Sequence, residues 1–285
     1  PNVNVCTVRT NCSAANGTLI PARQGMIYVP GALVAAGQPG AGSRVVFANN
    51  IIPASLINPV GKNAVAYYPL PNQTGLINNY LINSPANSND NQFIARIDYN
   101  ISARQQVYGR IIQESNLSTN DGPFPGNLAS TQNNMYSQAR PGTIGLDYVN
   151  TLTPRMVLHV SGGWARQSIV TRTISDGFDP TTLGFPSYVA NASGDRQFPS
   201  FIPTGYTTLG PNRSFGSTKN KQDSYSFNQE LSWLQGAHSF KFGANERAYR
   251  ISNHRADDPM GNFGFTRAFT ARTANDVVSG DAIAS

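Results

Sequence analysis

The sequence predicts a mainly β protein whose antiparallel strands run up and down and are joined by long irregular loops. From residue 91 onward, apolar and polar residues alternate strictly, which is the period of a strand with two chemically different faces. Charged residues make up only 13% of the chain and aromatic residues 10%, while 26 Gly and 19 Pro supply frequent turns. A typical globular protein is about one quarter charged, so this composition favours strands with long polar loops.

Each alternating segment presents an aliphatic and aromatic face opposite a polar one. In the first of them, Phe93 and Ile97 share one face, and Arg96 and Asp98 share the other. The expected strands lie at residues 91–101, 105–113, 143–152, 156–167, 224–233 and 240–248, with a seventh at 262–269. Periodicity alone does not decide whether the apolar face packs in a core or meets lipid.

The connections between these strands alternate in length. Few residues join the strands around 102–104, 153–155 and 236–237, whereas the other connections span about 114–141 and 170–220. An up-and-down barrel of the outer membrane has tight turns at one end and long loops at the other, and a Greek-key sandwich is less regular. About seven strands do not close a large barrel, so the sequence predicts a partial outer-membrane β-barrel that is not closed.

The hairpin at Gly236 and Ala237 allows a prediction of register. Glycine at the first central position suits a two-residue type II′ turn, which places Trp233 opposite Phe240 and both faces in chemical agreement. Glu246 is the misfit, since it falls on the apolar face; a carboxylate in mid-bilayer is costly, so we expect Glu246 at the membrane edge or above it.

Residues 1–90 show no sustained period and are interpreted as an irregular, extracellular-type region that leads into the strands of 91–285. One short helical turn is expected within 55–68, because apolar residues recur there at helical spacing. Cys6 and Cys12 have no nearby Cys or His partners for a zinc site, and a local disulfide between them is expected in an exported protein.

The charge pattern argues against a nucleic-acid binder and the motifs against an enzyme. The net charge is +6, but the arginines are scattered and form no single basic face. Asp147, His159 and Ser161 share a predicted face without the nucleophile turn of a hydrolase. His254 lies near two aspartates without the spacing of a calcium loop. We therefore expect no catalytic residue, metal or cofactor.

Four segments, at residues 52–72, 91–110, 238–250 and 257–266, occur in one order that resembles the barrel region of TonB-dependent receptors of the Oar-like type, as in Acidobacteria. The resemblance implies a barrel of about 22 strands filled by a plug domain, which links it to the TonB complex of the inner membrane. The plug and the remaining strands are not in this chain, which we interpret as a fragment of such a receptor.

Within this interpretation the apolar faces contact outer-membrane lipid and the polar faces line the lumen. The candidate lumen-lining residues are Arg96, Asp98, Arg110, Asp147, Glu230, Lys241 and Arg247. The expected role is import of a small molecule, glycan or peptide whose identity the loops do not reveal. The alternative is a secreted or surface β-sandwich that binds carbohydrate or protein.

Overall fold

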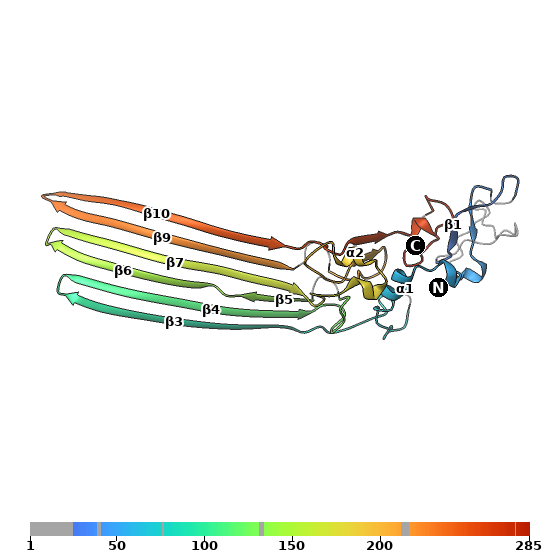
Figure 1. Cartoon of the computed structure of the whole chain (residues 1–285), viewed down its shortest axis with the longest axis horizontal. Coiled ribbons are helices and arrows are strands. Elements are labelled where there is room, and N and C mark those ends of the chain that lie inside the picture. Colours follow the sequence, from blue (N-terminus) through green and yellow to red (C-terminus); the bar gives the residue numbers. More distant parts are fainter. Residues whose placement is uncertain (1–24, 39–40, 76, 131–133, 212–216, 277) are drawn as a thin grey trace.

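A computed structural model describes residues 25–285, except 39–40, 76, 131–133, 212–216 and 277. Cys6 and Cys12, with the disulfide expected between them, lie outside these described residues. The chain forms a long, gently curved sheet with a globular cap at one end (Figure 1). Among the described residues, no helix is long and apolar enough to span a membrane.

Seven strands form the sheet, which we call the wall, and each is antiparallel to its neighbours. They are β3 (Ala86–Ser102), β4 (Gln105–Asp121), β5 (Asn134–Ala139), β6 (Gly142–Thr153), β7 (Met156–Thr173), β9 (Thr218–Gln235) and β10 (His238–Arg255). The strands β5 and β6 share one position between β4 and β7, interrupted at Arg140 and Pro141. The up-and-down order predicted from the sequence is thereby confirmed.

The wall strands are longer than their hydrophobic alternation, which corrects the expected loops. The first strand begins at Ala86, and much of the expected loop 114–141 is strand, because β4 continues to Asp121 and β5 begins at Asn134. The expected loop 170–220 likewise contains strand ends and short elements of its own. Backbone hydrogen bonds extend these strands into a region where neither face needs to be apolar, so the sequence period disappears there.

The seventh predicted strand, at 262–269, is not part of the wall. Its strand portion, β11 (Asn262–Phe265), pairs in parallel with β8 (Ser200–Pro203) in the cap, and the rest forms the 3-10 turn η4 (Arg267–Phe269). Four residues are too few to cross a bilayer, since a spanning strand needs about 9–11. The alternation of apolar and polar residues indicates a strand, but it does not specify the strand with which it pairs.

From β3 to β10, each tight hairpin turn lies farther from the cap than the turn before it. Gln105, the first residue of β4, pairs with Asn150, yet β6 continues to Thr153 before it turns. Met156 in turn pairs with Trp233, and β9 continues to Gln235. Each turn is displaced along the strands by about two to three residues over two interstrand distances, which corresponds to a strand slant of roughly 35–45°. Strands of membrane barrels have the same tilt.

The register predicted for the last hairpin is confirmed. Gln235 pairs with His238 and Trp233 with Phe240, and their rings lie 5.5 Å apart. Gly236 adopts φ 60°, as the first central residue of a type II′ turn requires. Glu246 pairs with Phe227 on the apolar face. Counted from the tight turns, Glu246 is the ninth residue of β10, and Trp164 is the ninth residue of β7.

No part of the described chain covers the apolar face of the wall. Ile97 is 76% exposed, Leu146 58% and Phe242 55%, and every buried hydrophobic residue lies outside the wall strands. In a sandwich, a second sheet would pack on this face. The arrangement therefore favours a wall whose apolar face meets lipid and gives no support to the β-sandwich alternative.

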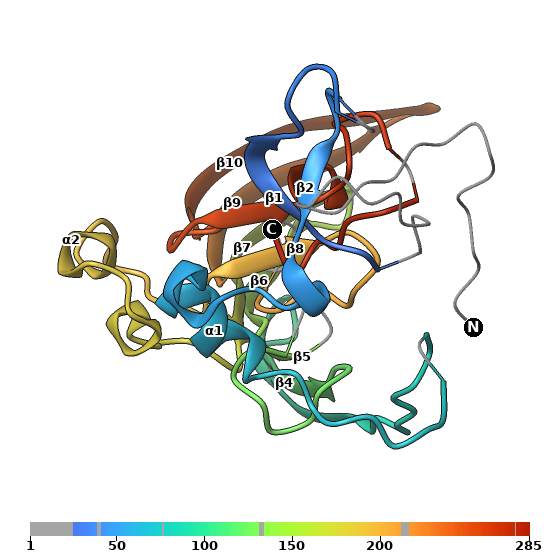
Figure 2. The same ribbon diagram turned by 90° about the vertical axis from the view of Figure 1, so that its right-hand side faces the viewer.

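The cap contains the hydrophobic core of the described chain. It also contains every described helix and the described strands that are not part of the wall (Figure 2). In chain order these are β1 (Tyr28–Leu33), β2 (Arg44–Val46), η1 (Ala48–Asn50), η2 (Ala54–Leu56), α1 (Pro59–Val65), η3 (Pro180–Leu183), α2 (Ser187–Ala190), β8, β11 and η4. The region before the wall is thus less irregular than the sequence suggested, and the helical turn expected within 55–68 is present as α1. Its start follows from Asn58, whose side chain accepts a hydrogen bond from the N–H of Val60, and from Pro59 at the first helical position.

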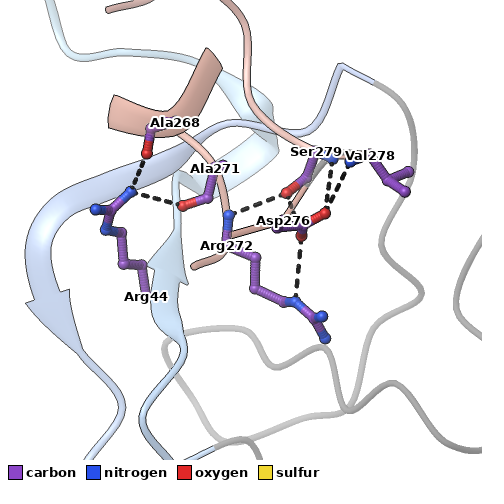
Figure 3. Close-up of polar contacts among 7 residues, drawn as sticks. All are labelled: Arg44, Ala268, Ala271, Arg272, Asp276, Val278 and Ser279. Atoms are coloured by element: carbon purple, nitrogen blue, oxygen red, sulfur yellow. Dashed lines mark hydrogen bonds and ion pairs between the residues drawn. The ribbon is translucent and has the colours of Figure 1, made fainter. Parts of the chain in front are cut away.

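Polar contacts fasten the β1–β2 ribbon to the C-terminal segment of the cap (Figure 3). One nitrogen of Arg44 donates to the carbonyls of Ala268, Phe269 and Ala271 at 2.6–2.9 Å. These are carbonyls at the end of η4, which lack partners within the turn itself. The guanidinium therefore caps η4 and joins segments more than 220 residues apart.

Asp276 closes the neighbouring loop (Figure 3). Its carboxylate accepts hydrogen bonds from the N–H groups of Val278 and Ser279 and from the Ser279 hydroxyl, and it lies 3.3 Å from Arg272. Burial raises the pKa of Asp276, but the hydrogen bonds from Ser279 and Val278 and the charge of Arg272 outweigh it, so the net pKa is lowered. The loop is consequently built around a charged carboxylate.

We expect this loop to loosen on acidification. A carboxylate whose pKa is lowered by folding stabilises the fold above its ordinary pKa of about 3.9, and this contribution is lost as the pH falls through the lowered folded value. The protection of the Arg272 amide, which donates to the Ser279 hydroxyl, should fall below about pH 4 when its exchange rate is divided by the intrinsic rate at the same pH. The Asp276→Asn variant should lose this pH dependence, and an equally steep dependence in the variant would contradict the assignment.

Candidate functional site

All seven residues proposed to line the lumen lie on one face of the wall. A row in register crosses six strand positions on this face, through Asp98, Tyr108, Asp147, Ser161, Asn228 and Asn245. Arg96, Arg110, Glu230, Lys241 and Arg247 lie an even number of residues from members of this row, so their side chains share its face. The period of two that defines a strand is sufficient to place them together.

Several of these side chains neutralise one another. Arg96 forms an ion pair with Asp98 at 2.6 Å and lies 4.0 Å above the ring of Tyr108. Lys241 on β10 pairs with Glu230 on β9 at 2.8 Å. These exposed pairs contribute little to stability, but they place fixed charges on the polar face of the wall.

Two arginines of this face have no carboxylate partner among the described residues. Arg110 and Arg247 lie in one register row with Gly145, Gly163 and Ser226 between them. Glycine and serine leave the middle of the row free of large side chains. The row therefore has a positively charged side chain on each side of a stretch of small residues. Another part of the protein or an anionic group can approach the backbone there.

The geometry does not assemble a hydrolytic triad. The His159 ring nitrogen lies 3.0 Å from the Asp147 carboxylate, while the Ser161 hydroxyl accepts a hydrogen bond from Asn228. No contact joins Ser161 to His159 among the described residues. In the outer region His254 contacts Asp195 at 2.6 Å, and nowhere in the described part of the chain do three His, Cys, Asp or Glu residues gather as a metal site would require.

The cap contains a second candidate site, an open cavity of about 1100 Å³. The cavity lining is mostly apolar and aromatic, with Phe185, Phe201 and Phe263 among the lining residues, and α1 forms part of one side. Ligand pockets are typically about 300–1000 Å³, with apolar walls and few polar groups. The cavity is thus large enough for a small organic molecule.

Two phenols lie at the polar margin of this cavity. Tyr206 donates to the Asp281 carboxylate at 2.6 Å, and Tyr68 donates to the carbonyl of Thr207 at 2.5 Å. Burial raises the pKa of Tyr68 to about 12, and burial together with Asp281 raises the pKa of Tyr206. Both phenols remain neutral hydrogen-bonding groups at any physiological pH.

Sequence reasoning did not foresee this cavity. The signal is a concentration of aromatic residues, most of them in segments that the sequence pattern assigns to irregular or long loops. The core cluster and its neighbours include Tyr67, Tyr68, Tyr80, Phe124, Phe178, Phe185, Phe198, Phe201, Phe263 and Phe265. Solvated loops have little use for so many large apolar side chains, so their density indicates loops that pack together.

Comparison with known proteins identifies the same architecture. The family described as outer membrane beta barrel domain matches residues 3–285. Neither the curated proteins nor the solved structures contain a significant match to the chain. The antiparallel slanted wall, its uncovered apolar face and this match agree with one another. The chain belongs to the outer membrane beta barrel domain family, and its place is the bacterial outer membrane.

Proposed function

We propose that this wall is part of a TonB-dependent importer of an external nutrient. The observation that carries the proposal is the cap, a folded structure with a large cavity at the end of the wall where all the long connections lie. A simple diffusion pore needs no packed aromatic core at this end of its wall. The ordered segments that resemble Oar-like receptors support the same conclusion.

In this proposal the two candidate sites act in sequence. The cap makes the first contact with cargo, because long loops of outer-membrane barrels face outward. The lumen face, with Arg110 and Arg247 as its uncompensated charges, then contacts cargo or a plug domain supplied by another part of the protein. These contacts are electrostatic and hydrogen-bonding, and no bond is made or broken.

The orientation is tested by labelling single cysteines in intact cells with a membrane-impermeant thiol reagent, after Cys6 and Cys12 are replaced by serine. Tyr188→Cys, on the exposed surface of α2, should react from outside. Ala237→Cys, in the turn at the opposite end of the wall, should react only after the outer membrane is permeabilised. Labelling of Ala237→Cys alone in intact cells would invert the topology and exclude a cargo-capturing cap.

Dependence on TonB is tested separately with the intact protein purified from outer membranes. The immobilised periplasmic domain of TonB should retain it, and an excess of the soluble domain should release it. Failure to bind, while the labelling pattern is as expected, would leave an outer-membrane barrel and remove the importer assignment.

A further inference from the structure

On β7 and β9, the outward face of the wall changes from apolar to charged within one step, whereas on β10 the carboxylate of Glu246 already lies on this face, one outward position before Ala248. Trp164 pairs with Tyr225, and Tyr225 pairs with Ala248. The next outward residues toward the cap are Arg166, Asp223 and Arg250, which also pair in one row. Trp and Tyr concentrate where a membrane meets water, so lipid headgroups are expected near this step.

The only carboxylate of this row, that of Asp223, already forms an ion pair. Arg166 binds Asp223 through two hydrogen bonds of 2.6 and 3.1 Å, and the Asp223 side chain is only 4% exposed. Arg166 also lies 4.9 Å from the ring centre of Trp164. Arg250 is the cross-strand neighbour of Asp223 on the other side but forms no ion pair with it.

Two more cations follow on β9. Lys221 pairs with Ser168 and Ser252, and Lys219, one outward position farther, pairs with Val170 and His254. Both lysines and Arg250 are exposed. Lys221 and Arg250 are diagonal neighbours across β9 and β10, at roughly 7–8 Å, close enough to share one anion.

We call Lys219, Lys221 and Arg250 the cationic patch; the Asp223 carboxylate, which lies nearby and interacts electrostatically with Lys221, is already bound by Arg166. No ion pair joins its members to any residue that the structure describes. At the other side of the wall, the corresponding outward residues of β3 and β4 are uncharged; they include Asn89, Asn91, Gln113 and Ser115. The charged outward residues thus lie on β7, β9 and β10, and the corresponding positions of β3 and β4 lack them.

We propose that the cationic patch binds the phosphate group of an anionic lipid of the outer leaflet. Lysine and arginine are the usual phosphate-binding side chains, and the Ser168 and Ser252 positions flank Lys221 with hydroxyl groups. The patch lies directly above the apolar band, so a lipid can place its phosphate on the cations while its acyl chains cover Trp164 and Tyr225. A soluble anion gains only the first of these contacts.

The proposal is tested by native mass spectrometry of the intact protein in detergent, with a bis-phosphorylated acylated glucosamine disaccharide as the probe. Lys219→Ser/Lys221→Ser should weaken binding by roughly tenfold to thirtyfold, from the typical contribution of a basic residue near anionic lipid. The control, Arg104→Ser/Arg155→Ser, removes the same charge from exposed turns at the opposite end of the wall and should bind as the parent does.

Three results would overturn the proposal: unchanged binding in the lysine variant, an equal loss in the control, or displacement of the glycolipid by inorganic phosphate at comparable concentration. The last result would assign the patch to a free anion. If the serine variant does not fold, Lys219→Gln/Lys221→Gln removes the same charges with less change in side-chain length and is judged by the same outcomes.

Discussion

Replacing Phe201 with alanine should destabilise the cap by about 3–5 kcal/mol, the usual cost of deleting a buried aromatic ring. Phe201 lies at the centre of the aromatic cluster, stacked on Phe263 at 5.5 Å and edge-on to Phe198 at 6.1 Å. Its backbone also exchanges two hydrogen bonds with Leu209. Loss of the ring removes contacts that join segments from different connections of the wall.

The measurement is hydrogen exchange in the intact, membrane-inserted protein, resolved between cap and wall. Cap amides of Phe201→Ala should exchange faster by several orders of magnitude, while the wall stays protected, because the apolar face of the wall is stabilised by lipid. Tyr188→Ala is the control, since Tyr188 is 73% exposed. Equal protection of the cap in both variants would show that the aromatic cluster does not hold it together.

Replacing Val160 with lysine should cost about 2–4 kcal/mol of wall stability, the price of a cation at the bilayer midplane. Val160 is the fifth residue of β7 and faces outward between Tyr148 and Gln229. Ser161, its neighbour along the strand, lies on the polar face between Asp147 and Asn228. A lysine at Ser161 gains a nearby carboxylate and loses one hydrogen bond, so its effect should stay within about 1 kcal/mol.

The two variants form a matched pair, because the same residue is introduced one position apart on opposite faces. Urea titration of the intact protein in lipid vesicles, followed by tryptophan fluorescence, compares their free energies of unfolding. A larger loss for Ser161→Lys than for Val160→Lys would place the apolar face inward and contradict a membrane wall.

Local rules predicted the wall with few errors. The hairpin at Gly236 was predicted residue by residue, because a two-residue turn and a period of two together leave one register that keeps Trp233 beside Phe240. The lumen candidates followed from the same period: once Arg96 is placed on a face, Asp98 must share it. The first strand was predicted to begin too late and the second to end too early, since Ala86 and Asp121 lie where the alternation of apolar and polar residues has stopped.

The sequence by itself determined the central stretches of the long wall strands, which of their faces is polar and which end has the tight turns, because these depend on neighbours along the chain and across one hairpin. It did not place β5 in the wall or β11 outside it. Only the tertiary structure decided the parallel pairing of β8 with β11, the aromatic cluster around Phe201 and the capture of Asp223 by Arg166. These contacts join residues about 60 positions apart or more in most cases, and no local period specifies such partners. These contacts depend on the strand order of the wall, which brings the outer connections close together.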